Sequence, residues 1–281
     1  MTSFISQIRN SKILKRFGVF RSLAKSGFRL ALRLVTGNKG VKIHVGKRVD
    51  LRLDYCFYFN KYENWGANHN DGYNCLLDHC QPGYTVIDVG AHIGLCALSA
   101  SRLVEPGGKV IAFEPSQTNY AYLQDHIRYN NVSNTQAYPF LVGETNIDGV
   151  PFYESSDPTG MNAIVHYKNL PNAKWVNRRQ ISIDDFCTKH SIVPNVIKID
   201  VEGAEIGVLK GAKKTIETHT PTIIISVHPR HLKLMGESEC DLHTLIQKLH
   251  YNITDVEGNA VNAFELKEYI MMPSRATVIE K

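Results

Sequence analysis

A carboxylate and two glycines follow an apolar run in the segment VIDVGAHIGL, residues 86–95. Asp88 closes the run, and Gly90 and Gly94 bracket the three residues between them. Glycine lets a chain turn tightly from a strand into a helix and lets a ligand approach the backbone. The helix that follows presents unpaired N–H groups and a positive dipole end. The segment therefore predicts a small polar ligand, although a tight turn without a ligand would need the same glycines.

Glu114 ends the next apolar run, 24 residues after Gly90. A carboxylate at this point can accept hydrogen bonds from both hydroxyls of a ribose, in a nicotinamide dinucleotide or in another adenosine-type ligand. The third glycine of the dinucleotide pattern G-x-G-x-x-G is missing. Asp88 would repel a diphosphate but attract a ligand ammonium group. These features favour S-adenosylmethionine over NAD.

The segment VIKIDVEGAE, residues 196–205, places Asp200, Glu202 and Glu205 around a second strand-to-helix junction. Glu202 and Glu205 can serve as acids in the first turn of a helix, where the dipole favours them. Asp200 ends a buried run, and His228 ends the following run, TPTIIISVH. Asp200 and His228 are candidate general bases, with Glu202 as a third catalytic candidate. Asp200, Glu202 and His228 could also hold Mg²⁺, and a purely structural histidine remains an alternative.

These side chains meet only if the apolar runs are neighbouring strands of one sheet. From residue 85 the pattern alternates between strands and helices, and residues 251–281 contain strand-like stretches around turns. Such an order predicts an α/β, doubly wound sheet that finishes in an antiparallel hairpin, with ligands at the carboxyl ends of its strands. That hairpin is foreign to the usual dinucleotide sheet. Strands are expected at 85–89, 110–114, 135–142, 195–200 and 220–228, and helices at 94–103, 116–129, 204–217 and 241–249.

Two stretches outside this alternation are candidates for contact with an acceptor molecule, or are simple surface loops. The first follows a hairpin expected over residues 41–53 and is the aromatic, amide-rich stretch FNKYENWGANHNDGY, residues 59–73. The second lies in residues 143–183, which read as a long loop or inserted excursion with a strand near its end. Its segment SSDPTGMNAIVHY, residues 155–167, is a candidate lid.

Basic residues are concentrated at the N-terminus. Residues 1–49 hold twelve Lys and Arg and no acid, so the remaining 20 basic and 27 acidic residues carry a net charge of −7. Arg21, Lys25, Arg29 and Arg33 recur every four residues and form one stripe on a helix. Such a helix fits an anionic membrane surface. A helix packed on the main domain, a transit peptide and a nucleic-acid arm are alternatives, but no nucleic-acid partner is expected because stacking aromatic residues are not interleaved.

We expect three parts: a basic amphipathic helical arm (1–40), a preamble with the hairpin and an acceptor-contacting segment (41–82), and the catalytic domain (83–281). No apolar run approaches the ~20 residues that cross a bilayer, and the start lacks a secretory signal. The six cysteines form no C-x-x-C pair, so a reducing cytosol fits best. The expected location is cytoplasmic, with peripheral membrane contact through the arm as a further hypothesis.

Three segments resemble a known family: TVIDVGAHIGLCALSASRLVEPGGKVIAFEPSQTNYAYLQDHIRYNNV, then ISIDDF, then NVIKIDVEGAEIGVLKGA followed by PTIIISVH. Over roughly residues 82–228 the chain resembles the FkbM-type methyltransferases, a branch of the class I S-adenosylmethionine-dependent methyltransferases. Members mostly O-methylate sugars, glycolipid or polysaccharide units and related natural products. The resemblance implies a Rossmann-like seven-stranded sheet with a cofactor surrounded by Asp88, Gly90, Ala91, His92, Gly94, Glu114, Pro115, Ser116, Asn119, Leu141, Val142 and Asp200.

Two residues depart from the family pattern. His92 stands where Asn is usual, and Ser226 stands where many members end the fifth strand with Glu, which puts an acceptor role for that carboxylate in doubt. The expected function is an S-adenosylmethionine-dependent O-methyltransferase acting on a sugar, glycolipid or polysaccharide hydroxyl. A divalent-metal-assisted small-molecule O-methyltransferase, with Mg²⁺ as a cofactor that is not favoured, and an NAD-type oxidoreductase remain alternatives. A further alternative is a binding protein that keeps this fold but has no catalytic activity.

Overall fold

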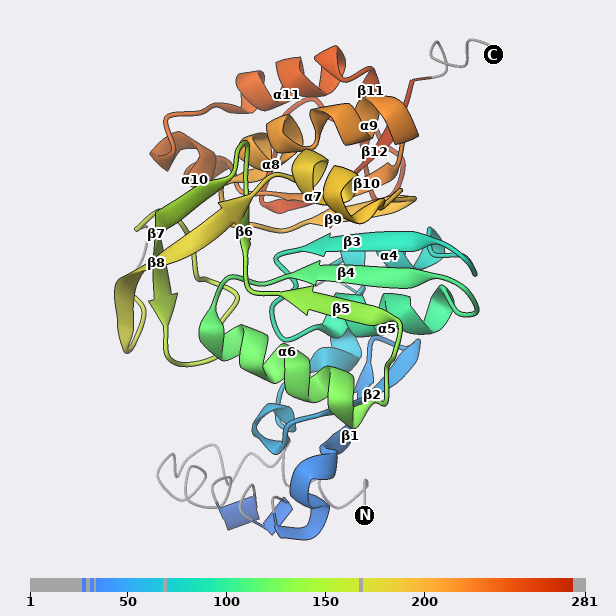
Figure 1. Ribbon diagram of the computed structural model, residues 1–281, viewed down its shortest axis with the longest axis vertical. Coiled ribbons are helices and arrows are strands. Elements are labelled where there is room, and N and C mark those ends of the chain that lie inside the picture. The colour runs from blue at the N-terminus through green and yellow to red at the C-terminus, as the bar shows by residue number, and fades with distance from the viewer. Residues whose placement is uncertain (1–26, 29–30, 33, 68–69, 167–168, 275–281) are drawn as a thin grey trace.

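The computed structural model describes residues 27–28, 31–32, 34–67, 70–166 and 169–274. A seven-stranded sheet forms its centre, with strand order β11-β12-β10-β9-β3-β4-β5 (Figure 1). The five neighbouring strands β10-β9-β3-β4-β5 pair in parallel, and β12 pairs antiparallel with both β10 and β11. The predicted doubly wound sheet with an antiparallel final hairpin is confirmed. Its strands are β3 (Thr85–Val89), β4 (Lys109–Phe113), β5 (Thr135–Tyr138), β9 (Val196–Ile199), β10 (Thr222–Val227), β11 (Tyr251–Asp255) and β12 (Lys267–Pro273).

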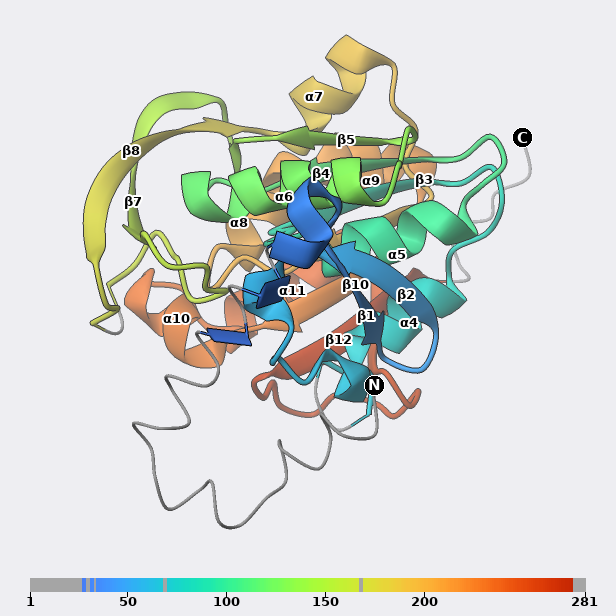
Figure 2. The same cartoon turned by 90° about the horizontal axis from the view of Figure 1, so that it is seen from below.

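The two faces of this sheet pack into two apolar cores, because successive strand residues point to opposite faces. In β3, Ile87 and Val89 belong to one core and Val86 to the other. Helices cover both faces, which explains why the central strands are apolar on both sides (Figures 1 and 2). The first face carries α7 (Ile183–His190), α8 (Glu205–Gly211), α9 (Lys213–His219) and α11 (Glu239–Lys248), and the second carries α4 (Gly72–Asp78), α5 (Leu95–Leu103) and α6 (Gln117–Tyr129).

Serine side chains fix where several helices begin. Ser116 lies just before α6 and accepts a hydrogen bond from the Asn119 N–H, so it caps the helix in which the sequence had placed it. Ser182 caps α7 in the same way. Ser238 forms a capping box with Asp241, which starts α11 two residues earlier than expected.

Residues 41–78 complete the second core. The hairpin expected over residues 41–53 is present as β1 (Val41–Val45) and β2 (Val49–Leu53), which pair antiparallel. The helix α4 was not expected from the sequence. Leu51, Leu53 and Leu76 are fully buried in the same core as α5. Short 3₁₀ turns connect these elements: η1 (Gly37–Lys39), η2 (Tyr55–Phe57) and η3 (Tyr62–Asn64).

The strand expected at 135–142 is two strands in different sheets. β5 stays in the main sheet, and Pro139, which has no N–H to donate, follows it directly. β6 (Leu141–Val142) pairs with β8 (Ala173–Ile181), which pairs antiparallel with β7 (Ile147–Ser155). The expected excursion is therefore largely an antiparallel ribbon. It curves past the carboxyl ends of the parallel strands (Figures 1 and 2).

The helix expected at 204–217 is divided at Ala212 into α8 and α9. Ala212 leaves the helical region, with φ −108° and ψ 3°. The preceding Gly211 lies against the backbone of Gly143, where a Cβ atom would overlap the Gly143 carbonyl oxygen. The contact between α8 and the turn after β6 thus coincides with the break. After β10, the short helix α10 (Pro229–Leu234) replaces part of an expected loop.

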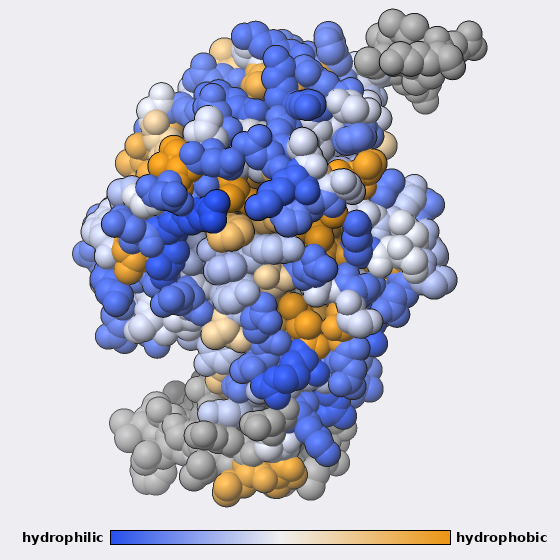
Figure 3. Space-filling view, viewed as in Figure 1, coloured by the Kyte–Doolittle hydropathy of each residue, from blue (hydrophilic) through white to orange (hydrophobic). Residues whose placement is uncertain are grey.

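The basic stripe predicted for the arm lies outside the described residues, because Arg21, Lys25, Arg29 and Arg33 all fall there. Of the arm's expected apolar face, Leu34 is 78% exposed in the part that is described. Among the helices in the described ranges, none combines the length and the apolar character needed to cross a bilayer. The face in Figure 3 is mostly hydrophilic, with separate apolar patches.

Candidate active site

A cavity of about 560 Å³ lies at the carboxyl ends of the parallel strands. That volume is within the usual range for a small-molecule site. Gly94 and Ser116 are outside the lining. The other predicted site residues all line it: Asp88, Gly90, Ala91, His92, Glu114, Pro115, Asn119, Leu141, Val142, Asp200, Glu202 and His228.

The loop after β3 is shaped by backbone conformations that few residues adopt. Gly90 has φ +83°, and a Cβ atom there would overlap the carbonyl oxygen of Asp200. His92 is also left-handed, with φ +52°. Asn and His are among the residues that tolerate this region best, which accounts for His92 where Asn is usual. The freedom of Gly90 therefore serves the packing of this loop against the end of β9, and not only the approach of a ligand.

Asp88 is a fully buried carboxylate that opens onto the cavity. Neither of its oxygens has a hydrogen-bond partner among the described residues. Burial raises its pKa to about 6, against the opposing charge of Lys198. An unpaired buried carboxylate costs free energy unless a ligand supplies a donor or a positive charge. The position is therefore suited to a ligand ammonium group.

Lys198 is a site residue that the sequence analysis did not assign. It lies opposite Asp88 in the parallel register of β9 and β3, and its Nζ donates to Asp200 Oδ2 at 3.0 Å. Burial opposes its charge, but Asp200 and Asp88 keep its pKa above the usual value. The signal was present in VIKID, because a lysine inside an apolar strand must find a buried partner.

Glu114 at the tip of β4 holds the glycine loop and the start of α6 together. Its Oε2 accepts from the His92 N–H at 2.8 Å, and its Oε1 accepts from the Ser116 N–H at 2.9 Å. Burial raises its pKa to about 7, although these hydrogen bonds favour the ionised form. Each carboxylate oxygen retains lone pairs for a further donor. Glu114 can therefore bind hydroxyl groups while it keeps the loop in place.

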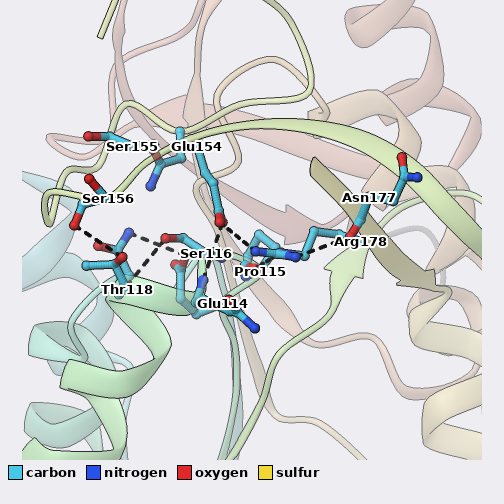
Figure 4. A network of polar contacts seen from close by, with 12 residues as sticks. Glu114, Pro115, Ser116, Thr118, Glu154, Ser155, Ser156, Asn177 and Arg178 are labelled. Atoms are coloured by element: carbon cyan, nitrogen blue, oxygen red, sulfur yellow. Dashed lines mark hydrogen bonds and ion pairs between the residues drawn. The ribbon is translucent and has the colours of Figure 1, made fainter. Parts of the chain in front are cut away.

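A buried ion pair ties the β7–β8 ribbon to this loop. Arg178 donates to Glu154 Oε1 at 2.6 Å and to the Pro115 carbonyl oxygen at 2.8 Å (Figure 4). Asn119 adds a second connection, because its amide donates to the Thr159 carbonyl at 2.9 Å. The ribbon thus fixes the segment next to Glu114 from the outside.

Asp200, Glu202 and Glu205 surround His228 at the end of β10. His228 Nδ1 lies 2.7 Å from Glu205 Oε1, and its Nε2 lies 3.6 Å from Glu202 Oε2 and 4.0 Å from Asp200 Oδ1. The structure therefore brings the three predicted catalytic residues together. Glu205 is in the first turn of α8, as expected, but it also orients His228. His231 stacks on the ring of His228 at 5.4 Å.

The protonation states separate the two candidate bases. Burial alone would lower the pKa of His228, but the hydrogen bond to Glu205 and the charges of Glu202 and Asp200 raise it to about 9. His228 is then a cation at neutral pH and a hydrogen-bond donor. Burial would raise the pKa of Asp200, yet Lys198 and His228 hold it below its usual value. Asp200 is therefore the one of the two that can accept a proton.

The same pairing disfavours Asp200, Glu202 and His228 as metal ligands. Asp200 already contacts the Lys198 ammonium, and His228 Nδ1 is bonded to Glu205. Within the described ranges, no group of three or more His, Cys, Asp or Glu side chains is arranged to hold a metal ion. The donor set does not fit Mg²⁺.

The remaining cavity wall comes from the segments that the sequence linked to an acceptor. Trp65 and Tyr73 from the aromatic stretch line it, with their rings 5.7 Å apart, and Thr159 lines it from the candidate lid. Contact with an acceptor stays a prediction. Glu268 on β12 also lines the cavity, and the sequence analysis did not single it out. Its signal was an acid next to the apolar run YIMM.

Comparisons with known proteins show a similarity to methyltransferases. The Methyltransferase FkbM domain family matches residues 88–253, which is more than half of the chain. "Hexuronic acid methyltransferase AglP" of Haloferax volcanii is 28% identical over 193 residues, covering 66% of this chain and 75% of the relative. "Methyltransferase 1" of Beauveria bassiana is 29% identical over 147 residues, covering 45% of this chain and 57% of the relative.

A solved structure of the methyltransferase FkbM from Methylobacillus flagellatus is 18% identical with a TM-score of 0.45. It covers 75% of this chain and 61% of that chain, so the protein spans less than two thirds of both this structure and the Beauveria relative. Because this similarity is low, we base the strand order on the pairing described above and not on the solved structure. The family match over residues 88–253, on the sheet and cavity described above, shows that the chain belongs to the FkbM methyltransferase family.

Proposed function

We propose that this protein is an S-adenosylmethionine-dependent O-methyltransferase acting on a hydroxyl group of a sugar, glycolipid or polysaccharide. One observation carries the proposal: Asp88 and Glu114, at the tips of the adjacent strands β3 and β4, open onto one cavity, and the buried Asp88 has no partner among the described residues. Membership in a methyltransferase family supports methyl transfer over the dinucleotide-dependent oxidation that the sequence left open.

The cavity residues fit this cofactor. The Asp88 carboxylate suits the ammonium group, Glu114 suits the ribose hydroxyls, and Leu141 and Val142 add apolar wall beside them. When bound, the cofactor supplies a methyl group on a sulfonium centre, and the thioether that departs when the methyl is transferred is already an excellent leaving group. The protein therefore has mainly to align an acceptor oxygen, and alignment can lower a barrier by up to ~7–11 kcal/mol in favourable cases.

Asp200 is suited to activate the acceptor. An alcohol is a weak nucleophile until its proton begins to leave, so a positioned base accelerates the reaction. Asp200 is ionised beside Lys198 and its side chain is 36% exposed to the cavity. His228 can donate a hydrogen bond to the acceptor or hold Asp200 in place from 4.0 Å. Asp200 thus takes the proton while His228 orients the groups around it.

A sugar acceptor is supported by two observations. The Haloferax volcanii relative is named for hexuronic acid, which is a sugar. The cavity wall here combines the aromatic Trp65 and Tyr73 with the amides of Asn70 and Asn162, which suits stacking and hydrogen bonding to a sugar ring. Incubation with methyl-labelled cofactor and fractionated glycans or glycolipids of the native host tests this. We expect label in a glycan fraction; label in protein or nucleic acid alone would contradict it.

The cofactor is tested separately by calorimetric titration with S-adenosylhomocysteine and with NAD⁺. We expect binding of the first and not of the second. The metal-assisted alternative is tested by removing divalent ions with a chelator. Activity that stays unchanged supports transfer through Asp200, and activity that is lost and then restored by Mg²⁺ would favour the alternative.

The basic stripe of the N-terminal arm supports a second proposal, peripheral contact with an anionic membrane. Arg21, Lys25, Arg29 and Arg33 at four-residue spacing suit lipid headgroups. Flotation with anionic liposomes, comparing the full chain with a chain lacking residues 1–35, tests it. Equal recovery of both proteins would remove the proposal, and loss on deletion would support it.

A further inference from the structure

Ser226 and Glu268 form a polar pair inside the cavity that the proposed reaction does not use. They lie opposite each other in the antiparallel register of β10 and β12, and both line the cavity. Their strand neighbours Val227 and Tyr269 pack into the first core, on the opposite face of the sheet. Both side chains therefore share the sheet face of Asp88.

Ser226 is buried and Glu268 is half-buried, and neither side chain bonds to a polar side chain among the described residues. The Ser226 hydroxyl is buried without a hydrogen-bond partner among the described residues. The Glu268 carboxylate makes no ion pair or hydrogen bond with another described side chain. Its pKa is raised, mainly by burial and to a smaller extent by the negative charge of Asp200. A buried group left unpaired costs free energy, and a ligand that offers donors would offset that cost.

The charges around this pair are acidic. Asp71 and Asp200 line the same cavity, and the negative charges of both act on Glu268. The cations that line the cavity are already paired: Lys198 with Asp200 at 3.0 Å, His228 with Glu205 at 2.7 Å, and Lys267 with Asp255 at 3.9 Å and Glu265 at 4.0 Å. The surplus charge that faces an acceptor is therefore negative.

We propose that Ser226 and Glu268 form an acceptor subsite that binds the hydroxyl or ammonium donors of a neutral or amino sugar and rejects a uronic acid. The inference rests on the proposed function and names its acceptor class. Ser226 and Glu268 accept hydrogen bonds from the ring substituents, and Trp65 offers the sugar an aromatic face. A site built to hydrogen-bond particular groups discriminates strongly against analogues that leave it unpaired. A uronate would add like charge beside Glu268, which opposes binding.

Binding of three glycosides to the protein saturated with S-adenosylhomocysteine tests the subsite. Methyl glucoside, methyl glucosaminide and methyl glucuronide share one ring stereochemistry and differ in charge. Ligand-observed saturation-transfer NMR detects weak binding of each. We expect signals from the glucoside and the glucosaminide and none from the glucuronide. Glucuronide binding as strong as that of the others, or binding of none, would overturn the inference.

Substitutions assign the selection to the pair. Glu268→Gln keeps the shape and removes the charge, so we expect it to weaken glucosaminide binding about tenfold and to admit the glucuronide. Ser226→Ala should weaken the binding of methyl glucoside, because it removes a hydrogen-bonding hydroxyl from the subsite. Glu217→Gln removes an exposed carboxylate on α9 that lies outside the cavity lining, so it is the matched control and should change none of these signals. If Glu268→Gln still bound the glucoside and the glucosaminide but not the glucuronide, as the wild type is expected to do, the proposal would be contradicted.

The affinity of each variant for S-adenosylhomocysteine distinguishes a failure of the proposed function from a failure of the acceptor subsite. Equal cofactor affinity in the wild type, Glu268→Gln and Ser226→Ala shows that the variants are folded and that the change lies on the acceptor side. Failure of the wild type to bind S-adenosylhomocysteine would contradict the proposed function itself. Normal cofactor binding with equal signals from all three glycosides would contradict only the acceptor class.

Discussion

Gly90 and Asp200 are in direct backbone contact, since the carbonyl oxygen of Asp200 occupies the space of a Cβ atom at position 90. The Asp200 N–H also donates to the Val89 carbonyl at 2.9 Å, and the Gly90 N–H donates to the Phe113 carbonyl at 3.0 Å. These bonds lock the loop that follows Asp88 onto the strand ends that carry Glu114 and Asp200. The groups assigned to the cofactor and the group assigned to the acceptor therefore belong to one rigid unit.

Gly90→Ala should destabilise the protein, because it disrupts the contact between this loop and Asp200. The φ of +83° strains any other residue by about 1–3 kcal/mol, and the overlap with Asp200 adds to it. We expect the free energy of unfolding in urea to fall by about 3 kcal/mol or more. Gly83→Ala is the matched control, because Gly83 has φ +86° with no atom within 4 Å of its Cβ position. Equal losses for the two variants would show that the contact with Asp200 contributes nothing.

Asp88→Asn should stabilise the protein without ligand. The folded protein holds a proton on Asp88 more tightly than the unfolded chain, because burial raises its pKa from 3.8 to about 6. Stability contributed by this group therefore falls as pH rises from about 4 to 6 and stays low above that range. Removing the charge should raise the free energy of unfolding at pH 8 by about 1–3 kcal/mol, with little gain at pH 4.

Thermal unfolding at the two pH values measures this difference. Asp148→Asn serves as the control, since the Asp148 side chain is 90% exposed and, among the described residues, forms an ion pair only with the exposed Arg179. Such a surface pair contributes less than about 1 kcal/mol. A loss of stability in Asp88→Asn at pH 8 would mean that the carboxylate has a partner that holds it.

Cofactor binding should weaken as the pH falls. Burial raises the pKa of Glu114 to about 7, so its carboxylate is ionised above neutrality and gains a proton below it. Only the ionised form can accept from both ribose hydroxyls on top of its two backbone donors. We expect the affinity for S-adenosylhomocysteine to decline between pH 8 and pH 6 in calorimetric titrations. Glu114→Gln should lose most of this decline and keep only the part that comes from Asp88, whose pKa is about 6. A wild type whose affinity does not change with pH would argue against the assignment.

Arg178→Met should loosen the ribbon. It would leave Glu154 buried without its cation and the Pro115 carbonyl without its donor, and breaking a buried pair costs about 3–5 kcal/mol. We expect lower stability in urea and weaker cofactor binding. Arg179→Met, one residue along on the exposed side of β8, is the control. Similar effects of both variants would refute a specific role for Arg178.

Several parts of this structure could be predicted from the sequence because the physics is local. Apolar runs that end in Asp88, Glu114 and Asp200 predict buried strands, and parallel strands bring their carboxyl ends to one edge. The antiparallel register of β12 and the short parallel pairing of β6 are set by contacts between distant segments. The ribbon β7–β8 was therefore expected only as an excursion, since its strands alternate weakly between buried and exposed positions.

Charged residues inside strands were the main omission at the site. Lys198 and Glu268 read as solvated side chains until the sheet order places them beside Asp88, Asp200 and Ser226. Their role depends on which face of which neighbouring strand they meet, and one chain's pattern does not contain that information. Gly94 and Ser116 have local roles that one can observe, because Gly94 shapes the turn before α5 and Ser116 caps α6, while their contact with the cofactor stays a prediction.

Calorimetric titration of S-adenosylhomocysteine into the wild type and Asp88→Asn at pH 8 tests most directly whether the unpaired carboxylate receives the ammonium group. We expect the wild type to bind and the variant, folded and at least as stable, to bind at least about tenfold more weakly. Equal affinities in the two proteins would contradict the assignment of the cavity to this cofactor.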